Sequence, residues 1–524
     1  MYYPSSIKNY LLNDPLIDYL QGHPKYKGKK QGKSKYSSYI ESKKWAFTQG
    51  CIVHFKGLYS PDKVYDLSEI TDIDTKCKKT IEVMNDPNIE CIIYGGLKKG
   101  NLVASPEIMI RKQNGFHVVE TRFSTCHYCK DNKTIRNSDY LWYCKTHVYF
   151  MNNLLPKPQK IAYLAVRKIG TETYKENLLE IPMNDLLKKR YTDALRWLFR
   201  LQKGSKEMVL DPPSIPELYP NMKVKNEEWD NLKQELAIKN REISLIWNIS
   251  TKQRKKLHEK NIYSWDHSHL FNTLQTTKTI PNSLNIQKQF IYVNKLKRSK
   301  KPKIVHQENV DILGKKDRVS LFVDFETVMD LDENSSSCSI NMTFMIGCVA
   351  LIDNKPIYKD FTVSKLVKEE EEKIYLRFIE YISRLSNKYN VSIPDIPLYH
   401  WSNAEKTFYK SAMKKYKLPD VNTFNWIDIY QIFKREPITL KNAWAFGLKN
   451  IAKVLYEQGE IKTTWSIEDA SDGQDAMIRV IKCNEKALNK NIPLKRFEEM
   501  HQIITYNYVD CQVLYEILEC LKKF

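Results

Sequence analysis

The run SLFVDFETV at residues 320–328 is short and apolar, which is typical of a buried β-strand, yet it contains two acids, Asp324 and Glu326. Because side chains alternate along a strand, residues two apart project from the same face. Two ionised carboxylates on one buried face repel each other and are costly to desolvate. A divalent cation between them removes that cost, and Mg²⁺ is typically held by a few carboxylates. The run therefore predicts a domain built around a metal site.

The residues that follow predict a mixed α/β domain over 319–524. Two further strands are predicted by NMTFMIGCVALID and KPIYKDFTV, a fourth by IPLYHW, and an amphipathic helix by EEEEKIYLRFIEYISRLSNKY. The tail, FEEMHQIITYNYVDCQVLYEILECLKKF, predicts a helix. Tyr506 and Asp510 are four residues apart there and share one face of the helix. Asp510 can thus join the acids of the strand, and Tyr506 can position an attacking water.

The order of these motifs resembles the DEDD exonucleases, and within them the YprB-like ribonuclease-H-like domains. The motifs are VDFET, FMIGC, YHWSNAE, WIDIYQIF, GLKNIAKVL and YNYVD. The resemblance implies that Asp324 and Glu326 hold two metal ions, Mg²⁺ or Mn²⁺, that Asp510 supplies the last ligand, and that Tyr506 orients a water. It implies phosphodiester hydrolysis from a 3′ end by a two-metal mechanism. The expected substrate is a single-stranded end of DNA or RNA.

The middle acid of this family is open to two assignments. The family pattern places an aspartate after a motif such as His-Asn-x-x-Phe-Asp, whereas this chain has His400 to Glu405. Glu405 is the assignment that follows, both as a catalytic acid and as a metal ligand. Asp428, in WIDIYQIF, competes for the same role. The change from aspartate to glutamate also motivates an alternative function, a catalytically inactive nucleic-acid-binding protein derived from nuclease folds.

Residues 46–200 predict a second mixed α/β domain, and GNLVASPEIMIRKQNGFHVVETRFS within it resembles the core of RecB-like PD-(D/E)XK nucleases, whose fold is restriction-endonuclease-like. The resemblance implies a second site at Glu107, Glu120 and Arg122, with His54 from the pattern Gly-x-x-x-His that begins at Gly50. Arg122 stands where the family has a lysine. Arginine keeps its proton and presents a planar fork, so both cleavage and binding without cleavage stay open.

The same domain contains a predicted helix beside the second site and a possible zinc-binding pattern. In the helix predicted by DYLWYCKTHVYFMNNLL, Thr146 and Phe150 fall nearest the positions that carry Gln and Tyr in the family. The spacing C-x2-C-x14-C-x2-H is compatible with a tetrahedral Zn²⁺ site, whereas the apolar helix pattern around the second pair favours a core position for Cys144. The four ligands would be Cys126, Cys129, Cys144 and His147.

Three further segments are predicted outside the two nuclease-like domains. Residues 1–45 end in a lysine-rich stretch and are expected to form a flexible basic arm, and residues 276–318 to form a basic linker. Residues 226–275 predict a small helical block that resembles a helix-hairpin-helix module, with Asn248 where such hairpins use glycine. A plain packing pair of helices explains the block equally well. The candidate nucleic-acid-binding side chains are Lys252, Arg254, Lys255, Lys256, Lys297 and Arg298.

The composition agrees with a nucleic-acid partner. Lys and Arg number 83 against 62 acids, a formal charge of +21, and nucleic acid is the commonest polyanion. No apolar run is long enough to span a bilayer and the N-terminus lacks a secretory pattern, so we expect a soluble intracellular protein that binds no membrane and has reduced cysteines. A helicase or a replication or repair protein that would deliver the substrate is not identified by the sequence.

Overall fold

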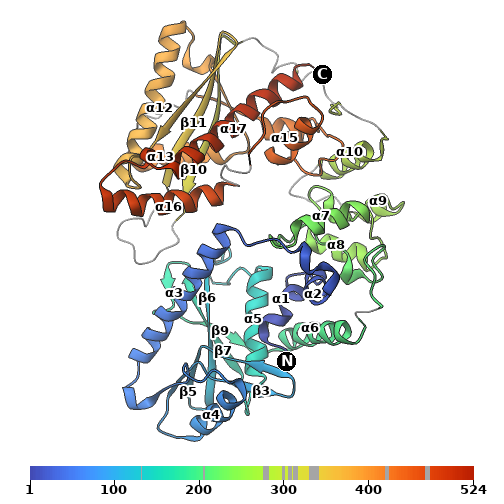
Figure 1. Cartoon of the computed structure of the whole chain (residues 1–524), viewed down its shortest axis with the longest axis vertical. Helices are drawn as coiled ribbons and strands as arrows, with labels where there is room; N and C mark the ends of the chain where they lie inside the picture. The colour runs from blue at the N-terminus through green and yellow to red at the C-terminus, as the bar shows by residue number, and fades with distance from the viewer. Residues whose placement is uncertain are drawn as a thin grey trace. The chain divides into compact units, whose positions relative to one another are not determined.

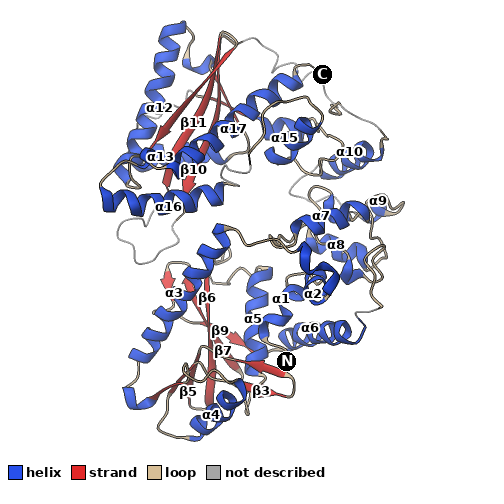
Figure 2. Ribbon diagram, viewed as in Figure 1, coloured by secondary structure: helices blue, strands red, loops and turns tan. Residues whose placement is uncertain are grey.

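The computed structural model describes residues 1–131, 133–204, 207–274, 282–297, 301–304, 310, 317–329, 342–418, 424–466 and 472–523. Arg298, one of the predicted nucleic-acid contacts, lies outside these residues. The chain divides into two compact units, unit 1 from Met1 to Glu242 and unit 2 from Ile243 to Phe524. Each unit is mixed α/β, with helices around a sheet (Figure 1; Figure 2).

The described part of unit 1 is built on a seven-stranded sheet in the order β1-β2-β5-β6-β7-β8, with β9 also paired to β7. The strands β5 and β6 form an antiparallel hairpin, and β7 runs parallel to β6. The strands are β1 (Val64–Asp66), β2 (Cys91–Ile93), β5 (Ile108–Lys112), β6 (Gly115–Cys126), β7 (Ile161–Ile169), β8 (Glu172–Thr173) and β9 (Leu179–Pro182), with β3 (Leu97–Lys99) and β4 (Leu102–Ala104) as a separate pair.

The helices of unit 1 contact this sheet and one another. Both α3 and α5 contact β6, and α6 packs on α5. Ser138 begins α5, because its side chain accepts a hydrogen bond from Leu141 N at 3.1 Å. The helices are α1 (Lys8–Leu11), α2 (Leu16–Gly22), α3 (Lys35–Gly57), α4 (Ile73–Asn85), α5 (Asp139–Asn152), α6 (Asp185–Gly204) and α7 (Asp230–Lys239).

The N-terminal 45 residues differ from the flexible arm that their lysine content predicted. Ile7, Leu16 and Leu20 are fully buried in the core of unit 1. The helix α3 begins at Lys35, where Ser34 accepts a hydrogen bond from Ser37 N at 3.0 Å, and continues to Gly57. The lysines of this segment lie mostly on the surface, so they do not prevent the apolar side chains between them from packing.

The described part of unit 2 contains a five-stranded sheet in the order β12-β11-β10-β13-β14. β11 is antiparallel to both β10 and β12, whereas β13 is parallel to β10 and β14 is parallel to β13. β10, the first strand of this sheet along the chain, therefore lies at the centre of the sheet. The strands are β10 (Val319–Val328), β11 (Met342–Ile352), β12 (Lys355–Thr362), β13 (Pro397–His400) and β14 (Asn425–Asp428).

The two faces of this sheet are covered by different helices. Phe322 contacts Tyr515 of α17, at 5.5 Å between ring centres, whereas Phe325 contacts Phe378 of α12 at 6.2 Å. Because Phe322 and Phe325 point to opposite faces, α17 and α12 lie on opposite sides of β10 (Figure 1). The described helices are α8 (Thr251–His258), α9 (Leu270–Thr273), α10 (Ser283–Lys295), α12 (Lys368–Tyr389), α13 (Ala404–Tyr416), α14 (Ile429–Arg435), α15 (Leu448–Glu457), α16 (Gly473–Lys490) and α17 (Glu498–Leu521).

The four strands, the amphipathic helix and the terminal helix expected in this region are therefore present, and β14 is an addition. Two segments between the sheets differ from expectation. The predicted helical block divides, since Trp229 beside α7 is part of the unit 1 core and Trp247 is part of a unit 2 core. The predicted linker contains α10, whose Ile286 and Phe290 are buried in that same unit 2 core.

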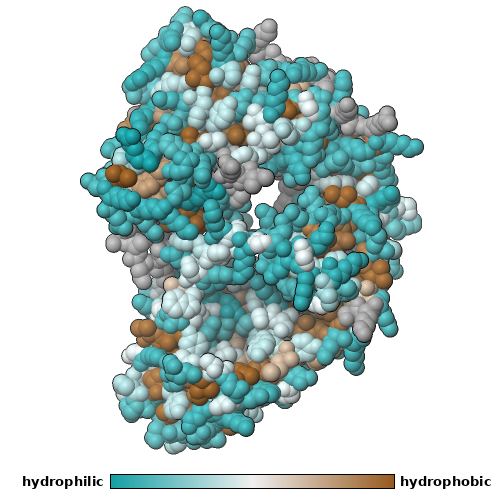
Figure 3. Space-filling model, viewed as in Figure 1, coloured by the Kyte–Doolittle hydropathy of each residue, from teal (hydrophilic) through white to brown (hydrophobic). Residues whose placement is uncertain are grey.

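The exterior of both units is mainly hydrophilic. On the face drawn in Figure 3, polar residues predominate and hydrophobic residues form small scattered patches. No helix in the described ranges is long and apolar enough to cross a bilayer.

Candidate metal centre

Three acids meet between β10 and α17. Asp324 and Glu326 project from the α17 face of β10, and Asp510 faces them from the middle of α17. One ligand oxygen of each lies within 4.8 Å of the others, and this is the only such group of metal-ligating side chains found among the described residues. Glu326 and Asp510 are each only 5% exposed, and Asp324 is half-buried. The strand and the terminal helix thus bring together three of the acids singled out in the sequence.

Burial and mutual repulsion make these acids weak. Burial and the carboxylate of Asp510 raise the pKa of Glu326 to about 8, and burial raises the pKa of Asp510 to about 7. The pKa of Asp324 is raised well above its ordinary value by burial and by the charges of Asp510 and Glu326. The charged form of the cluster is therefore costly in the bare protein, and a bound cation would relieve that cost.

Asn507 fixes the first of these acids. This residue is fully buried one turn before Asp510, and its Nδ2 donates to Asp324 Oδ2 at 2.8 Å and to Asp324 O at 3.2 Å. Its Oδ1 accepts a hydrogen bond from Tyr358 OH at 3.1 Å. Gly347 of β11, the residue paired with Asp324 of β10, leaves space for Asn507, because a Cβ on Gly347 would lie 1.4 Å from Asn507 Oδ1.

Asp510 is held by a different set of side chains. Trp465 Nε1 donates to Asp510 Oδ1 at 3.2 Å, and hydrogen bonding from Tyr506, one turn earlier on α17, also lowers the pKa of Asp510. Lys449 Nζ lies 4.8 Å from the ring centre of Tyr506 and 5.4 Å from that of Trp465. Tyr506 is thus placed beside the acids as the sequence indicated, whereas Lys449 and Trp465 were not anticipated.

Glu405 and Asp428 occupy distinct environments. Glu405 lies in the first turn of α13, is 6% exposed and pairs with His400 Nδ1 at 3.3 Å. Its charge raises the pKa values of both Asp324 and Asp510, although it lies outside the tight group of three. Asp428 instead caps α14, accepting hydrogen bonds from the backbone N of Ser402 at 3.0 Å and of Gln431 at 3.4 Å. The geometry therefore favours Glu405 as the acid that faces the cluster.

The donor set fits a hard divalent cation. Three carboxylates contribute only oxygen atoms, which Mg²⁺ and Mn²⁺ prefer over nitrogen and sulfur ligands. Their raised pKa values mean that protons and a metal ion compete for the same oxygens. Asp324, Glu326 and Asp510 could therefore hold a metal ion.

The predicted second site in unit 1 is partly assembled. Glu120 forms an ion pair with Arg122, and its Oε1 lies 3.4 Å from His147 Nε2. Glu107 accepts hydrogen bonds from Thr121 N at 2.9 Å and Thr121 Oγ1 at 3.1 Å. All of these residues line one pocket between α3, β6 and α5.

The two helices beside this pocket orient differently from the prediction. His54 is not among the residues that line the pocket, and its ring contacts Tyr174 at 5.7 Å between centres. On α5 the pocket is lined by His147 and Met151, whereas Thr146 and Phe150 are fully buried on an adjacent face of the helix. The face of α5 that meets the sheet is set by the packing of its apolar side chains, which sequence spacing did not resolve.

The four candidate zinc ligands are not brought together. Among the described residues they form no cluster with metal-ligand spacing. His147 is engaged through Nε2 with Glu120 and through Nδ1 with the Tyr143 hydroxyl at 3.2 Å. The thiols of Cys126 and Cys144 are buried in the unit 1 core. The four side chains are therefore not assembled as a metal site, and Cys126 and Cys144 pack in the core of unit 1.

The basic residues of the helical block have unequal access to solvent. Arg254 is only 8% exposed, so it cannot lie along a nucleic-acid backbone as predicted. Asn248 adopts a left-handed conformation with φ 60°, the backbone geometry for which glycine is usual. The remaining lysines on α8 and after α10 are exposed and stay candidates for backbone contacts, namely Lys252, Lys255, Lys256 and Lys297.

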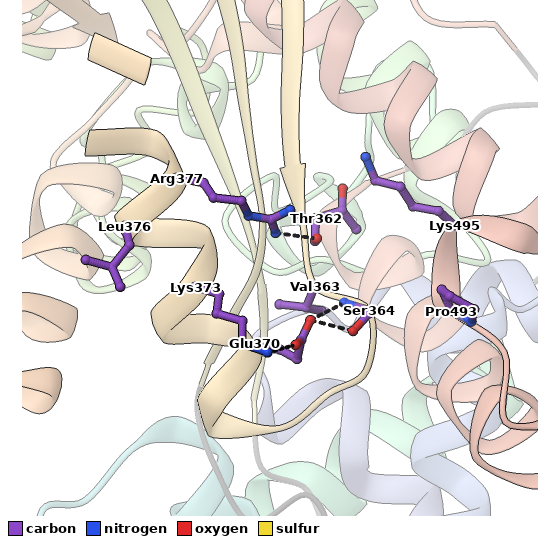
Figure 4. A pocket seen from close by; sticks show the side chains of 9 residues that line it. All are labelled: Thr362, Val363, Ser364, Glu370, Lys373, Leu376, Arg377, Pro493 and Lys495. Atoms are coloured by element: carbon purple, nitrogen blue, oxygen red, sulfur yellow. Dashed lines mark hydrogen bonds and ion pairs between the residues drawn. The ribbon is translucent and has the colours of Figure 1, made fainter. Parts of the chain in front are cut away.

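A separate pocket of about 500 Å³ in unit 2 includes none of the acids of the metal centre. Figure 4 shows its basic side chains already engaged: Arg377 donates to Thr362 O at 3.0 Å, and Lys373 pairs with Glu370 at 2.8 Å. The third, Lys495, pairs with Asp360. This pocket therefore offers less charge to a ligand than its composition suggests.

In comparisons with known proteins, no family model and no curated protein matches this chain.

Proposed function

We propose that unit 2 is a metal-dependent nuclease of the ribonuclease-H-like, DEDD-exonuclease kind, which shortens single-stranded DNA or RNA from its 3′ end. The observation that carries the proposal is the buried group of Asp324, Glu326 and Asp510, with Tyr506 one turn from Asp510. Burying three carboxylates together costs free energy, and such clusters are common at functional sites, where they bind catalytic cations.

The topology supports the fold part of this proposal. The strand that carries two of the acids is the first of the sheet and lies at its centre, with the antiparallel strand β11 on one side and the parallel strand β13 on the other. The closing acid comes from the final helix, which packs on β10 and β11. This convergence of motifs far apart in the sequence supports the proposal.

The side chains have distinct parts in the proposed reaction. Divalent ions, when bound, supply an activated water and stabilise the leaving 3′ oxygen. Asp324, Glu326 and Asp510 hold the ions, and Glu405 adds charge from α13. The hydroxyl of Tyr506 orients the attacking water. Asn507 keeps Asp324 in a single orientation through its two hydrogen bonds.

The test is cleavage of end-labelled single-stranded DNA and RNA with Mg²⁺, Mn²⁺ or EDTA. Wild type should produce a metal-dependent ladder that shortens from the 3′ end, and Asp324→Asn should lower the rate roughly a thousandfold or more. The matched control is Asp395→Asn, which changes an exposed acid of the same unit outside the cluster. Glu405→Gln and Asp428→Asn, compared directly, identify the middle acid.

The outcomes separate the candidate functions. Cleavage that persists in Asp324→Asn would move the chemistry to the pocket of unit 1. Absence of cleavage with every metal, together with salt-sensitive binding of the same strands, would replace the nuclease by a catalytically inactive nucleic-acid-binding protein.

A further inference from the structure

The pocket of unit 1 has the size and composition of a ligand site in its own right. Its volume is about 510 Å³, within the range of roughly 300–1,000 Å³ typical of small-molecule sites. It is formed by the N-terminal segment, α3, the β5–β6 hairpin and α5 (Figure 1). Its charged and aromatic lining includes Lys8, Lys44, Glu107, Glu120, Arg122 and Tyr140.

The two acids of this pocket are already engaged with donors of the protein. Glu120 is 3% exposed and forms a buried ion pair with Arg122, while burial and the charge of Glu107 still raise its pKa well above its ordinary value. Glu107 accepts two hydrogen bonds from Thr121, whose Oγ1 is also 2.7 Å from Thr48 Oγ1. A divalent cation would have to displace a buried guanidinium to reach Glu120, which would leave that guanidinium without its counter-ion. The arrangement is therefore unfavourable for metal binding.

The remaining charge in the pocket is positive. Outside the Glu120–Arg122 ion pair, Lys8 and Lys44 face the carboxylate of Glu107. Burial together with the charge of Arg122 holds the pKa of His147 well below its ordinary value, so the imidazole is neutral. An anionic group entering beside these cations would gain charge-assisted hydrogen bonds.

Aromatic side chains line the same pocket. Tyr140 is 37% exposed and Tyr3 is 41% exposed. The ring centre of Tyr140 lies 5.9 Å from that of Tyr143 on the same helix. Partly exposed rings beside lysines form a common platform for nucleobases, because every base has a flat face that can stack while the lysines hold its phosphate.

We propose that this pocket binds a nucleoside phosphate without a metal ion, with the phosphate held by Lys8 and Lys44 and the base stacked on Tyr140. The ligand is either a free mononucleotide or the phosphorylated end of a strand. The site is independent of the proposed nuclease centre, since its residues all belong to unit 1.

The experiment is calorimetric titration of the full-length Asp324→Asn protein with thymidine 5′-monophosphate in EDTA, so that neither hydrolysis nor metal binding in unit 2 contributes. Thymidine and inorganic phosphate, titrated separately, should each bind at least about tenfold more weakly, because each makes only one of the two contacts. A phosphorylated and an unphosphorylated oligonucleotide, compared in the same way, distinguish a strand end from a free nucleotide.

The variants are chosen at exposed positions so that the fold is preserved. Lys44→Ala and Tyr140→Ala should each weaken binding of the monophosphate by about five- to tenfold. Lys43→Ala, the adjacent lysine of α3 that lies against Tyr39 and does not line the pocket, should leave it unchanged. Absence of saturable binding in EDTA, or equal affinity in all three variants, would overturn the proposal. So would binding that appears only with Mg²⁺ and is lost in Glu107→Gln, since the acids would then hold a metal.

Discussion

The close approach of Asn507 to Gly347 permits a sharp test of how the metal centre is built. In Gly347→Ala, the new Cβ would lie 1.4 Å from Asn507 Oδ1, so one of the two must move. Because β11 is buried along its length and α17 packs on it, the amide of Asn507 is expected to rotate away. That movement breaks its 2.8 Å hydrogen bond to Asp324 and its 3.1 Å hydrogen bond from Tyr358.

The magnitude follows from these contacts. Loss of a hydrogen bond to a charged acceptor costs about 1.5–3 kcal/mol and of a neutral one about 1 kcal/mol, while overpacking a rigid core adds about 1–3 kcal/mol. Gly347→Ala should thus lower the free energy of unfolding by about 3.5–7 kcal/mol. Release of Asp324 should also weaken Mg²⁺ binding by about 10- to 100-fold.

The assay is urea unfolding of the full chain in EDTA, with Mg²⁺ affinity measured by calorimetry. A double-mutant cycle isolates the contact: in an Asn507→Ala background the clash is gone, so Gly347→Ala should then cost less than about 1 kcal/mol. Gly447→Ala is the matched control, because its Cβ would meet nothing nearer than Asn450 Nδ2 at 3.4 Å. A cost within 1 kcal/mol of wild type for Gly347→Ala, or an undiminished cost in the Asn507→Ala background, would refute the reasoning.

Three further predictions concern the same protein. The pKa is about 8 for Glu326 and about 7 for Asp510 in the folded protein, whereas both are roughly 4 in the unfolded chain. Protonation of these acids therefore stabilises the folded protein fully below about pH 4, and this stabilisation is lost as the pH rises to 8. Thermal unfolding in EDTA should show this decline, Mg²⁺ should reverse it at pH 8, and a flat profile would contradict it. Trp465→Phe removes the 3.2 Å hydrogen bond to Asp510 and should lower Mg²⁺ affinity about tenfold by calorimetry, with unchanged affinity counting against that role. Finally, a triple alanine variant changes the exposed lysines of α8, namely Lys252, Lys255 and Lys256. Fluorescence anisotropy at several salt concentrations measures the constant K for binding of single-stranded DNA or RNA, and the slope of log K against log [salt] should become shallower by about 2–3 in this variant. An unaltered slope would exclude these lysines from the interface.

Several features of the centre were predictable because they depend on local periodicity. Asp324 and Glu326 share a face because a strand repeats every two residues, and Tyr506 and Asp510 share a face because a helix repeats every 3.6. Gly347, within the buried run FMIGCVA, indicates that another group packs closely there, since glycine in a strand interior often marks such a close approach. Asn507, a polar residue three before Asp510, could have been placed on the same helical face by its spacing.

Other features depend on contacts between distant segments. Trp465 lies in a loop with no periodic signal, and its bond to Asp510 exists only because the chain after α15 returns to α17. The same limit applies to α5, where spacing alone pointed to Thr146 and Phe150 but packing turned His147 toward the pocket. The strand β14 is likewise set by its pairing with β13.

Local periodicity places acids on one face of the strand β10 and on one face of the terminal helix, because side-chain direction within one element follows from its backbone geometry. Contacts between distant segments bring Asp324, Glu326 and Asp510 within 4.8 Å, set the close approach of Asn507 to Gly347, and pair Glu120 with Arg122. These outcomes depend on how helices pack on sheets, and the free energy of that packing is shared among many residues far apart in the chain.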